Sequence, residues 1–381
     1  MKHRVLTLMV CKAMLALMMA GCASPDPASQ PARVEEITFK SGEFTLVGDL
    51  RLPEGKGPFP VVLFVHGSGP ADRTSFGAYL PTMERMLQAG YATFAWDKPG
   101  TGESTGTLDD KRFRAQRAQI LLDAINVMKA RRDIDATQIG LWGASQAGYV
   151  MPRALAQSKD VAFMICVSCA GESSYDQMAF QVTALALCNG VPKEKSAQEA
   201  QLLAELDEAR TYETYEQYLG YRETVKALGR LVSAPVERWP VLSQEGWRHS
   251  DPSVEAAWNP IEVIEQTTIP VLAIFGDKDR QIDPLQGAYA YRKALEQAGN
   301  PTSRVEVFAN ANHAIAASMT ACPAEDALMF QEYLKSLGYG SVEEAQAAIL
   351  KDPYKPGLMK DPPFAPGYLD LIEEWLRDLR K

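Results

Sequence analysis

Histidine and positive charge are scarce in this sequence of 381 residues. The chain has 4 histidines, and none is paired with a cysteine at zinc-site spacing, so we expect no metal and no cofactor. Asp and Glu outnumber Lys and Arg by 48 to 39, giving a formal net charge of −9 without a basic stripe. Nucleic acid is therefore not an expected partner. The length allows two domains, or one large domain with an insertion.

The sequence also lacks an apolar run long enough to cross a bilayer. Leu15–Ala20 is apolar and follows a positively charged start, but it is too short for a membrane span. Residues 1–21 are therefore predicted to be a secretory signal peptide. The proline- and serine-rich residues 22–34 have little to bury and are predicted to form a flexible tether.

The end of this signal, Met19-Ala20-Gly21-Cys22, resembles the lipobox of bacterial lipoproteins, with methionine where leucine is usual. The resemblance implies cleavage before Cys22 and lipid attachment to its thiol, which makes a membrane the expected partner. The following residues lack the aspartate that retains enteric lipoproteins at the inner membrane. An anchor on the periplasmic face of the outer membrane is therefore implied. The alternative is a plain signal peptide with a chance cysteine.

Four of the 6 cysteines would remain after cleavage and lipidation. Cys166 and Cys169 lie in an apolar run, and positions three apart on a strand point to opposite faces. We expect them to be buried thiols rather than a disulfide or a metal pair. Cys188 and Cys322 are a possible disulfide, which the sequence alone leaves open.

Buried-strand patterns alternate with helical patterns from residue 60 onward. An antiparallel hairpin is predicted before them, over 35–40 and 44–52. Apolar strands are then predicted to begin at Pro60 and over 91–97, 139–142, 161–167, 269–276 and 303–308, and helices over 82–89, 112–131, 284–298 and 368–379. This alternation predicts an α/β fold with a doubly wound, mostly parallel sheet.

One long stretch interrupts the alternation. Residues 172–268 are charged, carry mostly helical patterns and contain no buried-strand run. We predict that they form a helical lid inserted into a core made of residues 35–171 and 269–381.

A serine lies where a predicted strand passes into a helix. The stretch Gly143-Ala144-Ser145-Gln146-Ala147 matches the nucleophile pattern G-x-S-x-G except for Ala147. Such a turn needs small neighbours, and alanine adds one methyl group. Pro152, inside the predicted helix, removes one backbone hydrogen bond and should kink the helix without disturbing the serine. Ser145 is the predicted nucleophile, the alternative being an ordinary turn serine.

A glycine-rich segment, His66-Gly67-Ser68-Gly69, ends the first buried strand. Its position predicts that the backbone N–H groups of Ser68 and Gln146 form an oxyanion hole. His66 is predicted to hold this loop rather than to act as a base.

The acid and the base are expected later in the chain, in the order Asp or Glu and then His. His313 follows the last predicted strand and is the expected base. Asp277, Asp279 and Asp283 all follow the preceding strand, and we favour Asp279 as the residue that orients the imidazole. Loops after parallel strands meet at one edge of a sheet, which would bring these groups to Ser145.

Taken together, these segments resemble the α/β-hydrolase superfamily, in particular secreted or lipoprotein acyl esterases related to the dienelactone-hydrolase and serine-aminopeptidase-like branches. The matching stretches are VHGSGPADR, WDKPGTGES, GASQAGYVMP, FGDKDRQI and ANHA. The resemblance implies an α/β-hydrolase fold and the triad Ser145, Asp279 and His313. It makes Pro152 expected, leaves Ala147 as the departure, and gives Asp97–Ser104 the role of shaping a loop beside the site.

The leading functional hypothesis is a serine hydrolase that cleaves carboxylic esters of small to medium acyl groups through an acyl-enzyme. A peptidase or amidase of the serine-aminopeptidase type is the first alternative, since it differs only in the leaving group. A catalytically inactive, lipid-anchored binding protein on the same fold is the alternative from another class.

Overall fold

The computed structural model describes residues 33–109, 112–198, 214–231, 243–245, 258–352, 354 and 362–381. The predicted signal peptide, Cys22 and all but the last two residues of the predicted tether lie outside the described residues. No helix in the described ranges is long and apolar enough to cross a bilayer.

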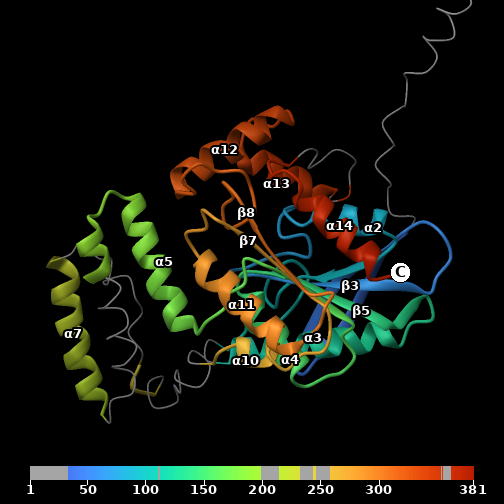
Figure 1. Cartoon of the computed structure of the whole chain (residues 1–381), viewed down its shortest axis with the longest axis horizontal. Coiled ribbons are helices and arrows are strands. Elements are labelled where there is room, and N and C mark those ends of the chain that lie inside the picture. Colours follow the sequence, from blue (N-terminus) through green and yellow to red (C-terminus); the bar gives the residue numbers. More distant parts are fainter. Residues whose placement is uncertain are drawn as a thin grey trace, which may run out of the picture. The chain divides into compact units, whose positions relative to one another are not determined.

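The described residues form an eight-stranded sheet in the order β1-β2-β4-β3-β5-β6-β7-β8 (Figure 1). The strands are β1 (Arg33–Ser41), β2 (Phe44–Leu52), β3 (Phe59–Val65), β4 (Ala92–Trp96), β5 (Ile134–Ala144), β6 (Phe163–Val167), β7 (Val271–Gly276) and β8 (Arg304–Phe308). The pairs β1–β2 and β2–β4 are antiparallel, and every pair from β4 to β8 is parallel. The predicted α/β fold with a mostly parallel sheet is confirmed.

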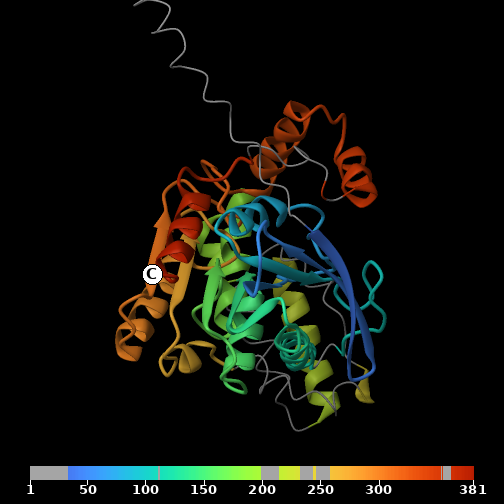
Figure 2. The same cartoon turned by 90° about the vertical axis from the view of Figure 1, so that its right-hand side faces the viewer.

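Helices cover both faces of the sheet (Figure 2). The longer helices of the described residues, not all of which pack on the sheet, are α2 (Leu80–Gln88), α3 (Phe113–Lys129), α4 (Ala147–Leu155), α5 (Ser174–Cys188), α7 (Tyr215–Leu231), α11 (Pro284–Ala298), α12 (Pro323–Ser336), α13 (Val342–Lys351) and α14 (Tyr368–Asp378). Successive strand residues point to opposite faces. Val61 and Leu63 therefore join a core cluster with α3, α4 and α11, whereas Val62 and Phe64 join one with α2 and α14.

The largest difference from the predicted strands concerns β5, which begins at Ile134 rather than Ile139. Phe59 pairs with Ile134, and the register then shifts so that Val61 pairs with Ile139. None of the four intervening residues is buried, and three of them, Asp135, Thr137 and Gln138, are polar, so no apolar pattern marks them as part of a strand.

The described segments between β6 and β7 contain helices and connecting residues. The last of these helices, the short α10 (Ile261–Ile264), contributes Ile261 and Ile264 to the core cluster on the α3 side. The division into core and lid stays a prediction.

The cysteines occur in two different states. A disulfide joins Cys188, at the end of α5, to Cys322, the residue before α12. Cys166 and Cys169 are free and buried, as predicted. The disulfide ties a helix of the predicted lid to the segment that follows β8.

Candidate active site

Ser145 lies between the end of β5 and the start of α4. Its φ is +56°, in the left-handed region that costs any residue other than glycine conformational energy. Its backbone N–H donates to Val167 O at 2.9 Å, which fixes the turn against β6. Strained backbone of this kind persists where the surrounding structure enforces it, most often at functional sites.

The alanine in the nucleophile motif fits this turn. A Cβ on Gly143 would lie 2.6 Å from the Ala147 Cβ and 2.8 Å from Met151 Cε, so position 143 has no room for a side chain. Ala147 is fully buried, and its methyl group packs against Gly143, where there is no side chain. Position 148 is equally restricted, since a Cβ there would lie 2.6 Å from that of Cys169.

His313 and Asp279 lie together, after β8 and β7 respectively. His313 Nδ1 is 2.7 Å from Asp279 Oδ2. The other oxygen, Oδ1, accepts hydrogen bonds from the N–H groups of Gln281 at 2.7 Å and Ile282 at 3.0 Å. The Asp279 side chain is fully buried, whereas that of His313 is 19% exposed. The carboxylate is therefore fixed on both sides, and it orients an imidazole that remains accessible.

The other two candidate aspartates have different partners. Asp283 caps α11 by accepting from the N–H groups of Leu285 and Gln286. Asp277 lies 3.5 Å from Lys278 Nζ. Of the three predicted candidates, Asp279 is thus the one that contacts His313.

Ser145 and His313 lie at the same edge of the sheet, because both follow the carboxyl ends of parallel strands. Within the described residues, no hydrogen bond joins the Ser145 hydroxyl to His313. Such bonds are often long in enzymes without substrate and tighten in the substrate complex. The structure therefore joins the predicted acid and base by a hydrogen bond, and the predicted nucleophile lies at the same edge of the sheet.

The His66–Gly69 loop passes directly against the serine turn. A Cβ on Gly67 would lie 3.3 Å from Ala144 O and 3.5 Å from the Ser145 Cβ. The backbone N–H groups of Ser68 and Gln146 have no hydrogen-bond partner among the described residues. Both are thus available beside Ser145, where the sequence predicts the oxyanion hole.

His66 itself is a structural residue of this loop. It is buried, its ring stacks on Tyr79 with centroids 5.5 Å apart, and Nε2 lies 2.6 Å from Trp96 O. Burial lowers the pKa of His66 to about 3, so the ring is neutral and Nε2–H donates to that carbonyl. This arrangement agrees with the predicted role in holding the loop.

Two cations lie behind the loop: Lys98 belongs to the Asp97–Ser104 motif that was expected to shape a loop beside the site, whereas Arg117 was not singled out from the sequence. Lys98 Nζ donates to Gly67 O at 2.7 Å and to Gly69 O at 2.5 Å. Arg117 donates to the carbonyl of His66 and, at 2.6 Å, to Gln146 Oε1. A signal for Arg117 was present, because helical spacing places it on the same buried stripe as Ile120 and Leu121.

The motif Asp97–Ser104 is held by Arg73. Asp97 is buried, and its oxygens accept from the Arg73 N–H and from the Glu103 N–H. The Arg73 guanidinium lies 2.8 Å from Asp97 Oδ2 and 2.7 Å from Asp49 Oδ1. Burial alone would lower the pKa of Arg73, but the hydrogen bonds with Asp97 and Asp49 raise it above its ordinary value.

Replacing Arg73 by methionine should therefore leave a buried carboxylate unpaired. We expect the free energy of unfolding to fall by about 3–5 kcal/mol, as for other broken buried pairs. Urea unfolding at neutral pH measures this change. The matched control is Glu103→Gln, which removes an exposed partner of the same guanidinium and should cost about 1 kcal/mol or less. Equal losses in the two variants would contradict this account.

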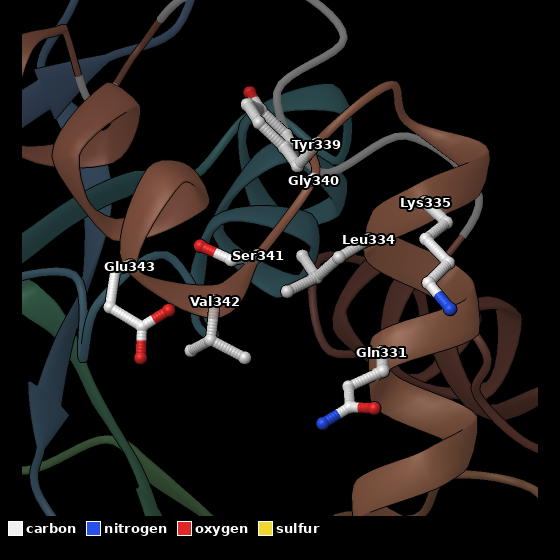
Figure 3. A pocket seen from close by; sticks show the side chains of 8 residues that line it. All are labelled: Gln331, Leu334, Lys335, Tyr339, Gly340, Ser341, Val342 and Glu343. Atoms are coloured by element: carbon white, nitrogen blue, oxygen red, sulfur yellow. The ribbon is translucent and has the colours of Figure 1, made fainter.

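A cavity of about 360 Å³ adjoins His313. Its lining includes Gln181 and Leu185 of α5 together with Arg280 and Ala321. A second cavity, of about 340 Å³, lies between α12 and α13 and is lined by residues such as Leu334, Tyr339 and Val342 (Figure 3). The lining of that cavity contains none of the predicted catalytic residues, whereas the lining of the cavity beside His313 contains His313 itself, which makes the latter the better candidate for a substrate site.

The chain matches the alpha/beta hydrolase family over residues 62–325, more than half of its length. It belongs to this family. The match spans the serine turn, Asp279 and His313, and includes the described part of the predicted lid.

The sequence identity to individual relatives is low. Esterase EstD of Thermotoga maritima is 23% identical over 295 residues, which are 74% of this chain and 62% of EstD. An uncharacterized 31.7 kDa protein of Escherichia coli is 30% identical over 111 residues, 29% of this chain and 37% of that protein. The chain thus matches less than two thirds of the length of either relative. Among solved structures, the Pyrococcus furiosus esterase Pf2001 has a TM-score of 0.47 and 16% identity, covering 83% of this chain and 96% of its own.

Proposed function

We propose that this protein is a serine hydrolase that cleaves carboxylic esters of small to medium acyl substrates. The observation that carries the proposal is the arrangement at the sheet edge. A serine in a strained strand-to-helix turn lies beside two available N–H groups and shares its sheet edge with a buried aspartate that is hydrogen-bonded to an accessible histidine. Membership of the alpha/beta hydrolase family and the likeness to an esterase, EstD, support the same class of reaction.

In the proposed reaction, His313 Nε2 takes the proton of the Ser145 hydroxyl as its oxygen attacks the ester carbonyl. Asp279 keeps the proton of the imidazole on Nδ1 and stabilises the imidazolium that forms. The N–H groups of Ser68 and Gln146 stabilise the negative charge that develops on the carbonyl oxygen. His313 then protonates the leaving alcohol, and a water molecule releases the acid from Ser145 by the same steps.

Labelling with a fluorophosphonate tests the proposal most directly. The purified protein should react covalently at Ser145, because the reagent needs an activated serine beside an oxyanion hole. Hydrolysis rates for p-nitrophenyl esters of increasing acyl-chain length are then compared with those for aminoacyl anilides, which distinguishes an esterase from a peptidase. We expect faster hydrolysis of the esters. Failure of the wild type to label would overturn the proposal, and a preference for anilides would replace the esterase by a peptidase.

We also propose that the mature protein is a lipoprotein held on the outer membrane through Cys22. The support is the lipobox-like Met19–Cys22 and the proline- and serine-rich residues after it. Labelled palmitate should be incorporated by the full chain in a bacterial host, and Cys22→Ser should lose the label. Unchanged incorporation in that variant would contradict the anchor.

A further inference from the structure

We propose that Lys98 is a positioning residue that orients the Gly67–Ser68 peptide, and so directs the Ser68 N–H toward the developing oxyanion. The inference rests on the proposed hydrolase function, which it deepens by assigning a role to a side chain outside the triad and the oxyanion hole. Arg117 joins the two halves of the same hole.

One peptide bond carries both the carbonyl that Lys98 binds and the N–H proposed for the oxyanion hole. The Gly67 carbonyl and the Ser68 N–H belong to the same planar peptide, and in a trans peptide these two groups point in opposite directions. Lys98 Nζ holds the Gly67 carbonyl at 2.7 Å. The Ser68 N–H must therefore point away from Lys98.

Without the hydrogen bond from Lys98, the backbone of this loop would have considerable conformational freedom. Gly67 and Gly69 flank Ser68, and Gly69 has a φ of +73°. Glycine readily adopts alternative backbone conformations, so a rotated Gly67–Ser68 peptide would be accessible to an unrestrained loop. That rotation would turn a carbonyl oxygen toward the site and repel the oxyanion. Lys98 also donates to Gly69 O at 2.5 Å, so it restrains the loop at a carbonyl on each side of the Ser68 residue.

Arg117 links the loop to the other proposed donor. It donates to the His66 carbonyl and to the side chain of Gln146, whose backbone N–H is the second member of the hole. Ser145 O accepts from the Gly148 N–H at 2.9 Å, so the N–H of the Ser145–Gln146 peptide points the opposite way, out of the helix start. One guanidinium thus links the loop that carries Ser68 to the side chain of Gln146.

The positive charge of Lys98 and Arg117 bears on the stability of the oxyanion as well. Both cations are buried, and within the described residues neither forms an ion pair with a carboxylate. Burial, with a contribution from the charge of Arg117, lowers the pKa of Lys98 to about 7. Lys98 is therefore only partly protonated at neutral pH, and it is chiefly the buried charge of Arg117 that favours negative charge developing in front of the hole. Burying these cations costs free energy, and their role in the proposed reaction accounts for that cost.

The test compares Lys98→Met and Lys98→Gln with the wild type, using Lys129→Met as a control that removes a partly exposed lysine paired with Asp160. Loss of an oxyanion donor lowers kcat by about 10²–10³-fold, so Lys98→Met should lower kcat by about 10²-fold with little change in KM. Lys98→Gln retains a hydrogen-bond donor and should recover part of the loss. Lys129→Met should behave as wild type.

A thiono ester, in which sulfur replaces the carbonyl oxygen, separates orientation from general damage. Sulfur is a weak hydrogen-bond acceptor and gains little from an intact oxyanion hole. Lys98→Met should therefore lose more activity toward the oxygen ester than toward the thiono ester. Equal losses toward both substrates, or unchanged kcat in Lys98→Met, would overturn the proposal. A wild type that neither labels nor hydrolyses esters would overturn the hydrolase function itself, which is a different result.

Discussion

Replacing Ser145 by alanine is expected to lower kcat/KM for ester hydrolysis by about 10⁶-fold, the scale seen when a triad serine protease loses its nucleophile. The expectation follows from the proposed acyl-enzyme, since alanine has no atom that could attack the substrate. Initial rates with a p-nitrophenyl ester measure the loss, and intact-mass analysis after fluorophosphonate treatment measures the missing adduct. The fold should persist, because alanine is smaller than serine and the turn has room for it.

Ser68→Ala is the matched control for that experiment. Ser68 is proposed to act through its backbone N–H, which alanine retains, so this variant should keep activity close to that of the wild type. Ser145→Gly adds a second readout. Glycine accepts the φ of +56° without strain, so this variant should be equally inactive but more stable than Ser145→Ala by about 1 kcal/mol. A Ser145→Ala variant that labels and hydrolyses esters like the wild type would rule out the proposed nucleophile.

The sequence predicted the parts of this fold that depend on local patterns. Apolar runs located the buried strands, and α11 begins and ends at the predicted residues 284 and 298. The order of residues along the chain also placed Asp279 and His313 at one edge of the sheet. Their contact could be anticipated because neighbouring parallel strands end together.

Features that depend on long-range contacts were left open by the sequence or escaped prediction. The Cys188–Cys322 disulfide spans 134 residues, and sequence spacing does not determine which cysteines pair over such a distance. The contacts of Lys98 and Arg117 with the His66–Gly69 loop also depend on the fold, because these residues are distant from the loop in the sequence. The cavity beside His313 depends on the placement of α5, whose sequence shows only that it is helical.

The second prediction with a large effect concerns Asp279. Asp279→Asn should lower kcat by about 10⁴-fold, as the equivalent change does in a serine protease. The two backbone donors at Gln281 and Ile282 determine how the new amide is oriented. They require an acceptor, so the amide oxygen must face them and the amide NH2 must face His313.

That orientation reverses the hydrogen bond on which the proposed base depends. An NH2 group opposite His313 Nδ1 makes this nitrogen an acceptor, which places the imidazole proton on Nε2. A protonated Nε2 cannot accept the proton of Ser145, so the loss should appear in kcat while KM changes little. Asp277→Asn makes the same charge change two residues earlier, at a carboxylate beside Lys278, and should leave kcat nearly unchanged. If Asp277→Asn lost as much activity as Asp279→Asn, the loss would reflect charge near the site rather than the tautomer of His313.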